Sequence, residues 1–195
     1  NGVFVSNNGI CVSTWKPFVG AMKAEVTDNN GQKYSVETIL GANELYDVAK
    51  FKITAKTNAA LFAPSVVANS AAWIVMPSQA GAPIKANIDK VEKFMTKYNY
   101  CVLSTTASEK YNGAPVLNDK GQIVGIYNSN GTLQSATDAK YANDFVLTGL
   151  SQNDPTLLQS GIRIALPQQP DEAIIALMLS ATKIESLRMA TINDF

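Results

Sequence analysis

Short hydrophobic segments separated by turn residues fill the first 130 positions of the chain. Val48-Ala49-Lys50-Phe51-Lys52-Ile53 alternates apolar and polar residues, the pattern of a strand with one buried and one solvated face. Other segments predict strands at 3–5, 10–12, 24–26, 34–36, 72–76, 86–94, 100–103 and 123–126. Asn8-Gly9, Asn30-Gly31 and Asn130-Gly131 are turn dipeptides that tolerate positive φ. This spacing predicts an all-β protein built from barrels or sandwiches.

The pattern changes after about residue 136. Hydrophobic residues recur at helical spacing between 138 and 150, and residues 161–167 form one more apolar segment typical of a strand. Residues 171–180 predict a helix. Residues 183–194 predict a second helix, with Thr182 and Glu185 placed as a capping box.

Composition and charge exclude several classes of partner. The chain has 195 residues, 46% of them hydrophobic, which is enough for a substantial core. Its 16 basic and 16 acidic side chains are interspersed, whereas a nucleic-acid surface needs a clustered excess of Lys and Arg. No hydrophobic segment reaches the roughly 18 residues that span a bilayer. We therefore expect no nucleic-acid partner and no membrane span.

The chain contains two cysteines, Cys11 and Cys101, and no histidine. Two thiols 90 positions apart do not match the clustered Cys and His spacing of zinc sites, so no metal and no cofactor are expected. The thiols are either buried apolar side chains or a disulfide. The lack of histidine removes the commonest general base and every Ser-His or Cys-His nucleophile pair.

Three segments, in order, resemble the signature regions of the trypsin-like serine protease family, especially its bacterial branch. Residues 6–21 resemble the strand and loop that carry the histidine, with Lys16 at the histidine position. Residues 41–53 resemble the aspartate region, and Asp47 matches the aspartate. Asn112-Gly113-Ala114-Pro115-Val116 resembles the nucleophile loop, with Asn112 at the serine position.

The nucleophile loop departs from the family pattern of Gly, any residue, Ser, Gly, Gly, Pro. Lys110 falls on the first glycine, Gly113 keeps the next, and Ala114 falls on the last. Residues 118–126 resemble the hairpin after this loop, and 161–167 the final barrel strand. The resemblance covers about residues 1–180, apart from an apparent insertion near 130–160.

The resemblance implies two antiparallel six-stranded β-barrels of trypsin-like fold with C-terminal helices. Residues 1–64 would form the first barrel, its opening strand or strands preceding residue 1. Residues 65–170 would form the second barrel, and 171–195 would be helices leading to a possible helical-repeat domain downstream. Family habit and the low charge favour a periplasmic or secreted location.

The residues at the triad positions imply a catalytically inactive homologue. A Lys16–Asp47 ion pair would keep Lys16 charged and unfit as a base, and the Asn112 amide is not a usable nucleophile. Lys110 in place of glycine disturbs the backbone that aims the oxyanion donors. In the family the cleft between the barrels binds an extended peptide by strand addition, which needs no nucleophile. The resemblance thus implies a pseudoprotease that binds a peptide or protein.

Two alternatives remain open on the sequence. One is an active hydrolase with an unrecognised nucleophile, for which the hydroxyls near Asn112 are the candidates: Ser104, Thr105, Thr106, Ser108 and Tyr111. The other is a β-rich module unrelated to proteases.

The resemblance to trypsin-like proteases makes two structural predictions. Lys16, Asp47 and Asn112 should meet at the mouth between the barrels, although 31 and 65 residues separate them in sequence. Alternation places Val12, Val26, Val36, Val48 and Phe51 inside the first barrel, and Trp73, Val75, Val102, Val116, Ile123 and Ile164 inside or lining the second.

Overall fold

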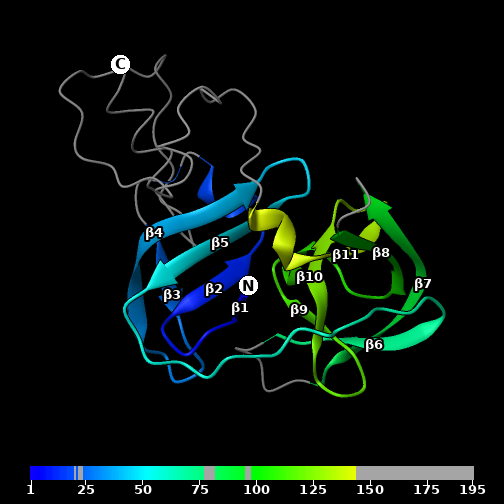
Figure 1. Cartoon of the computed structure of the whole chain (residues 1–195), viewed down its shortest axis with the longest axis horizontal. Helices are drawn as coiled ribbons and strands as arrows, with labels where there is room; N and C mark the ends of the chain where they lie inside the picture. Colours follow the sequence, from blue (N-terminus) through cyan, green and yellow to red (C-terminus); the bar gives the residue numbers. More distant parts are fainter. Residues whose placement is uncertain (20, 22–23, 77–81, 95–97, 144–195) are drawn as a thin grey trace, which may run out of the picture.

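Antiparallel pairing of short strands organises the part of the chain that the structure describes. A computed structural model describes residues 1–19, 21, 24–76, 82–94 and 98–143. These residues form a five-stranded sheet in the order β1-β2-β5-β4-β3 and a closed barrel in the order β10-β11-β8-β7-β6-β9 (Figure 1). The predicted all-β class is confirmed, with one closed six-stranded barrel and one half-barrel sheet.

The described residues form eleven strands and three short 3-10 helices. The sheet contains β1 (Gly2–Phe4), β2 (Ile10–Ser13), β3 (Glu25–Thr27), β4 (Lys33–Asn43) and β5 (Val48–Ile53). The barrel contains β6 (Ser70–Ile74), β7 (Ile84–Phe94), β8 (Tyr98–Thr105), β9 (Pro115–Leu117), β10 (Ile123–Ser129) and β11 (Gln134–Thr137). The 3-10 helices are η1 (Lys16–Phe18), η2 (Glu109–Tyr111) and η3 (Ala139–Asn143). No helix in the described residues is long and apolar enough to span a membrane.

Three Asn-Gly dipeptides, Asn8-Gly9, Asn30-Gly31 and Asn130-Gly131, form turns between paired antiparallel strands. Gly9, Gly31 and Gly131 have φ of 86°, 81° and 86°, and they join β1 to β2, β3 to β4 and β10 to β11. Glycine adopts this left-handed conformation without the steric penalty of a side chain. The turn predictions are confirmed.

The barrel closes through a strand that the hydrophobic pattern does not reveal. β11 pairs with β10 on one side and with β8 on the other, which completes the ring. Residues 161–167, predicted to be the final barrel strand, lie outside the described residues, as do the predicted helices over 171–180 and 183–194. The helical spacing that begins at 138 corresponds to η3 as far as residue 143.

The first group of buried side chains, the sheet core, belongs to the five-stranded sheet and η1. It is formed by Cys11, Trp15, Phe18, Val26, Ile39, Ala42, Ala49, Phe51 and Ile53. The inward placement of Val26 and Phe51 is confirmed, and Val36 packs against this core while remaining partly exposed.

A separate barrel core shows that the inward face of two barrel strands is shifted by one residue from the prediction. Trp73 and Val102 are half-buried, whereas their neighbours Ala72, Ile74, Cys101 and Leu103 are buried in the barrel core. Val75 is also half-buried, while Val116 and Ile123 are buried as predicted. Ile164 lies outside the described residues. A shift of one residue exchanges the two faces of a strand, and the predictions for Trp73, Val75 and Val102 are wrong for this reason.

A third group of buried side chains, the junction cluster, joins the sheet to the barrel. It comprises Val12, Val48, Tyr98, Ile126, Ala139 and Tyr141. Val12 and Val48 therefore point toward the barrel and not into the sheet core. The prediction that they lie inside the first barrel is wrong. The Tyr46 ring stacks on Tyr141 with centroids 4.1 Å apart and extends the contact to the β4–β5 loop.

Candidate functional site

Lys16 and Asp47 meet at one end of the sheet. Lys16 begins η1, separated by two residues from the end of β2, and Asp47 lies in the loop between β4 and β5. The Lys16 backbone amide donates to Asp47 Oδ1 at 2.7 Å, and Lys16 Nζ lies 3.7 Å from Oδ2. The expected ion pair is present. The lysine side chain is 68% exposed and that of Asp47 only 8%.

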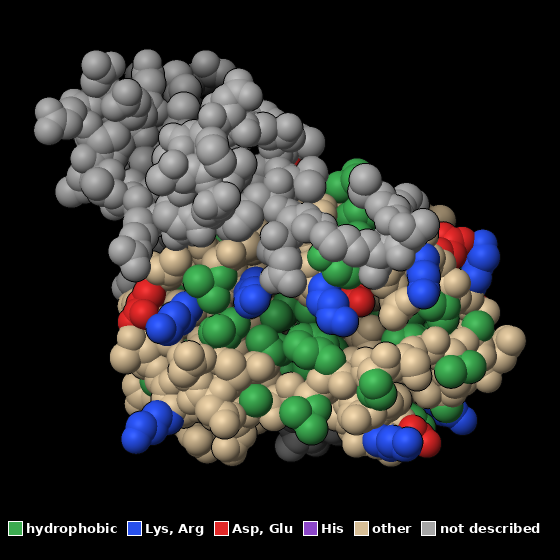
Figure 2. All heavy atoms as spheres, viewed as in Figure 1, with side chains coloured by type: hydrophobic (Ala, Val, Ile, Leu, Met, Phe, Trp, Pro, Cys, Tyr) green, Lys and Arg blue, Asp and Glu red, His purple; other side chains and the backbone are tan. Residues whose placement is uncertain are grey.

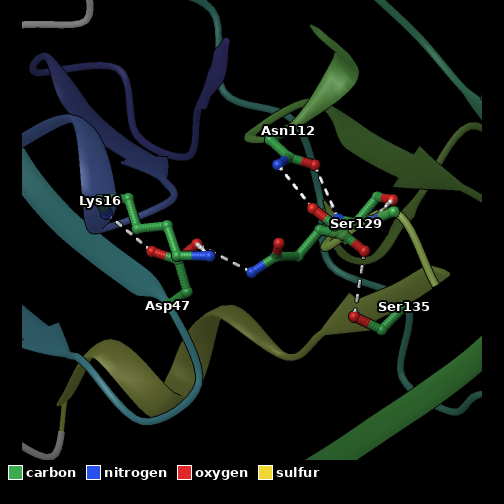
Figure 3. A network of polar contacts seen from close by, with 7 residues as sticks. Lys16, Asp47, Asn112, Ser129 and Ser135 are labelled. Carbon is green, nitrogen blue, oxygen red and sulfur yellow. Dashed lines mark hydrogen bonds and ion pairs between the residues drawn. The ribbon is translucent and has the colours of Figure 1, made fainter. Parts of the chain in front are cut away.

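The backbone conformation at Asp47 places its carboxylate within hydrogen-bonding distance of both η1 and β10. Asp47 has φ of 50°, a left-handed conformation that aspartate and asparagine tolerate better than most residues. The Asp47 amide donates to the Glu44 carbonyl at 3.2 Å, and the Tyr46 amide donates to Asn43 Oδ1 at 3.1 Å. This tight turn points the carboxylate toward Lys16 on one side and the barrel on the other (Figure 3).

Asn112 is held by the end of β10. Its Oδ1 accepts a hydrogen bond of 2.7 Å from the Ser129 amide, and its Nδ2 donates to the Ser129 carbonyl at 3.0 Å. The Asn112 side chain therefore mimics a strand partner for one residue of β10 (Figure 3). Both polar ends of the amide are occupied within the protein.

Asn128 connects the two halves of the site. Its Nδ2 donates to Asp47 Oδ2 at 2.9 Å. Because Ser129 is the next residue, a continuous chain of contacts runs from Lys16 through Asp47 and the 128–129 segment to Asn112 (Figure 3). The structure thus links the three sequence-predicted positions through Asn128 and Ser129, which the sequence did not single out. Their only sequence signal is a position just before the Asn130-Gly131 turn.

The backbone amides around Asn112 are used inside the protein. The amides of residues 111, 112, 113 and 114 donate to the carbonyls of Ser108, Glu109, Tyr127 and Tyr111 at 3.1, 2.9, 2.9 and 2.9 Å. An oxyanion hole needs donors directed at the reacting atom. Three of these amides are directed into the turn around η2, and that of Gly113 is directed at β10.

Lys110, Gly113 and Ala114 are the other positions of the loop that resembles the nucleophile loop. Lys110 is exposed, and its Nζ lies 5.2 Å from the centroid of the Tyr111 ring. Its carbonyl accepts a hydrogen bond of 2.8 Å from Asn1 Nδ2. Gly113 has φ of 87°, and a Cβ there would lie 2.1 Å from the Asn1 carbonyl oxygen. Ala114 is fully buried in the barrel core.

The other candidate nucleophiles lie outside this network. Ser104 is exposed on β8 and donates to Asp89 on β7, whose pKa this hydrogen bond lowers. Thr105 donates to the Lys85 carbonyl at 3.1 Å. Thr106 and Ser108 are exposed and Tyr111 is half-buried. None of these five residues lines the cleft described below.

Both cysteines are free thiols buried in separate cores, which excludes the disulfide alternative. Burial raises the pKa of the Cys11 thiol to about 12. Burial, with a smaller contribution from Asp138, raises the pKa of Cys101 to about 12. The thiolate is the nucleophilic form of cysteine, so neither residue is suited to attack a substrate.

A cleft of about 410 Å³ adjoins Asp47 between the β4–β5 loop and the β10–β11 hairpin. It is lined by Lys16, Glu44, Leu45, Tyr46, Asp47, Tyr100, Asn128, Asn130, Leu133, Ser135 and Thr137. Leu45 and Leu133 are 72% and 41% exposed. Ser135 donates to the Asn128 carbonyl at 3.2 Å and braces the polar side of the cleft (Figure 3).

Comparisons with known proteins add no family assignment. No protein-family model matches the chain, and no curated protein matches it either. Among the described residues, no cluster of three or more His, Cys, Asp or Glu side chains is arranged to hold a metal ion.

Proposed function

We propose that this chain is a catalytically inactive member of the trypsin-like fold that binds an extended peptide or protein segment in the cleft beside Asp47. The observation that carries the proposal is the network at that cleft. Lys16 and Asn112 occupy the positions where the resemblance places the base and the nucleophile, and each is engaged in contacts that suit a structural role.

Three features support the absence of acyl-transfer chemistry. Asn112 has no hydroxyl or thiol, and its amide bonds both polar atoms of the Ser129 backbone. Asp47 accepts from the Lys16 amide and from Asn128, so its carboxylate supports a loop instead of orienting a base. The amides of residues 111 to 114 donate to other carbonyls of the protein, which leaves those four unavailable to an oxyanion.

The lining of the cleft supports peptide binding. Tyr46 and Tyr100 provide aromatic surface, with centroids 6.3 Å apart, and the exposed Leu45 and Leu133 flank the opening. Asn130 adds an amide side chain to the same lining. Apolar walls with a few polar groups are typical of ligand pockets, and 410 Å³ lies in their usual range of about 300–1,000 Å³.

The competing function is a hydrolase with an unrecognised nucleophile. The hydroxyl residues nearest Asn112 in sequence favour it least, because Ser104 and Thr105 bond Asp89 and Lys85 on the outer part of the barrel. The two thiols are buried with pKa values of about 12.

One substrate can test binding and cleavage together. Fluorescein-labelled casein is an extended, unfolded protein, so its anisotropy reports binding and its fragmentation on a gel reports hydrolysis. The expected result is increased anisotropy with casein intact and no labelling of the protein by a fluorophosphonate. Leu45→Asp should weaken binding, whereas Val67→Asp should not, since Val67 is 65% exposed and lies outside the cleft. Fragmentation of casein, or equal binding by both variants, would contradict the proposal.

A further inference from the structure

A second, smaller hollow lies where β2 and β5 meet η3 and the segment before β6. It has a volume of about 180 Å³ and is lined by Val5, Ile10, Val12, Lys50, Phe62, Ala139 and Lys140. On the face drawn in Figure 2, hydrophobic side chains gather near the middle, with basic side chains beside them. None of its lining residues belongs to the cleft beside Asp47.

The strand register explains why apolar and basic side chains meet here. β2 and β5 are antiparallel neighbours in which Ile10 lies opposite Lys52 and Val12 opposite Lys50. Directly opposite residues project from the same face of a sheet. This is the outer face of the sheet, because Val12 and Val48 on it belong to the junction cluster. The alternation of residues 48–53 therefore places two lysines of β5 beside two hydrophobic residues of β2.

The barrel side completes the hollow. η3 contributes Ala139 and the exposed Lys140, and the segment before β6 contributes Phe62, which is 38% exposed. Phe62 is fixed by a bridge to Ile123 at the start of β10. Within the described chain, the lining thus contains two lysines and no carboxylate.

We propose that this hollow is a docking site for a partner protein segment in which one apolar side chain is flanked by carboxylates. Its volume is below the range of about 300–1,000 Å³ typical of pockets for whole drug-sized ligands, so it accepts one side chain. Val5, Ile10 and Phe62, which are at least partly exposed, contact that side chain. The exposed Lys140, and Lys52 opposite Ile10, attract the flanking carboxylates, since complementary charge favours encounter and register at an interface.

The proposal does not depend on the peptide-binding role of the larger cleft. The probe is the pentapeptide acetyl-Glu-Glu-Leu-Glu-Glu-amide, titrated into the ¹⁵N-labelled protein and followed by amide chemical shifts. The expected result is saturable shifts at Ile10, Val12 and Lys140, with no shifts at Asn128 or Ser135. The peptides Lys-Lys-Leu-Lys-Lys and Glu-Glu-Ala-Glu-Glu test charge and apolar anchor separately, and each should bind at least about fivefold more weakly. Octanoate tests a free carboxylate with an aliphatic tail.

Matched variants locate the site. Lys140→Glu should weaken binding of the acidic peptide about fivefold, and Lys120→Glu, an equal charge change at an exposed turn, should leave it unchanged. Phe62→Ala should weaken binding, while Leu61→Ala, one residue away and outside the hollow, should not. Both charge-reversal positions are exposed, so these variants test the site even if truncation of Phe62 disturbs the fold. No saturable shifts, tighter binding of octanoate than of the peptide, or equal binding by Lys140→Glu and Lys120→Glu would overturn the proposal.

Discussion

The backbone amide of Lys16 and the carboxylate of Asp47 are joined by a hydrogen bond of 2.7 Å, shorter than the 3.7 Å between the same carboxylate and the lysine ammonium. The buried aspartate therefore supports the start of η1 mainly through the backbone. The exposed lysine side chain adds a weaker, solvent-screened contact.

This relationship predicts unequal effects of two substitutions on stability. Asp47→Ala leaves the Lys16 amide and the Asn128 amide group without their acceptor and places alanine at φ of 50°, so the free energy of unfolding should fall by about 2–4 kcal/mol. Lys16→Met should cost less than about 1 kcal/mol, because the side chain is 68% exposed. Urea denaturation measures both. Equal losses would mean that the ion pair, not the backbone hydrogen bond, is the main contact.

Placing a histidine and a serine at the positions where the trypsin-like proteases carry their base and nucleophile should not produce hydrolysis. In Lys16→His/Asn112→Ser, the amide of residue 112 still donates to the Glu109 carbonyl within the turn of η2. One missing oxyanion donor costs roughly 2.7–4 kcal/mol in the transition state. We expect no reaction with a fluorophosphonate, monitored by mass spectrometry of the intact protein. Stoichiometric labelling of the introduced serine would show that the loop rearranges readily.

Two glycines in equivalent Asn-Gly turns should respond differently to alanine. Gly31→Ala introduces a Cβ with no neighbouring atom within 4 Å, so it meets only the backbone strain of φ at 81°, about 1–2 kcal/mol. Gly9→Ala places its Cβ 2.1 Å from the Ile53 carbonyl oxygen, which adds a cost of about 1–3 kcal/mol, as overpacking does. Thermal unfolding of the two variants measures the difference. Equal losses would indicate that the β1–β2 turn shifts to relieve the contact.

Both thiols should be unreactive in the folded protein. With a pKa of about 12, only about one thiol in 10⁴ is ionised at pH 8. Ellman's reagent should therefore detect no cysteine at pH 8 until the protein is unfolded, when it should detect two. Burial raises the pKa of both thiols above the unfolded value, so the folded state favours the protonated thiols. The resulting contribution to the free energy of unfolding is complete below about pH 8.5 and decreases as the pH rises toward 12. Rapid reaction of one thiol in the folded state would contradict its burial.

The Ser104 hydroxyl should influence Asp89 and not catalysis. Hydrogen bonds from Ser104 and Asn87 lower the pKa of the Asp89 carboxyl, with Ser104 the larger contributor. Ser104→Ala should raise that pKa toward its ordinary value, as followed by NMR titration of the carboxyl carbon. Thr106→Ala, an exposed change on the same strand connection, is the control. An unchanged Asp89 pKa in Ser104→Ala would show that this bond does not persist in solution.

The local sequence pattern was sufficient to predict the strands with alternating hydrophobic residues and the turns that need glycine. β5 coincides with the predicted 48–53 segment, and Gly9, Gly31 and Gly131 all have positive φ. β11 was missed because Gln134-Ser135-Ala136-Thr137 carries no hydrophobic alternation, although both of its sides are paired in the ring. Its strand conformation comes from its neighbours, a case in which tertiary context overrides local preference.

The sequence by itself determined that the first 130 residues consist mainly of short strands and turns, that three hairpin turns lie at Asn-Gly, and that no histidine is present to serve as a base. Only the tertiary structure decided that Val12 and Val48 face the barrel and that Asn128 reaches Asp47 across 81 residues. Alternation specifies that a strand has two different faces, but the neighbouring elements decide which face is covered. A polar side chain likewise forms its hydrogen bonds with the groups that the fold brings within about 3 Å of it. When those groups are distant in sequence, the local sequence pattern does not identify them.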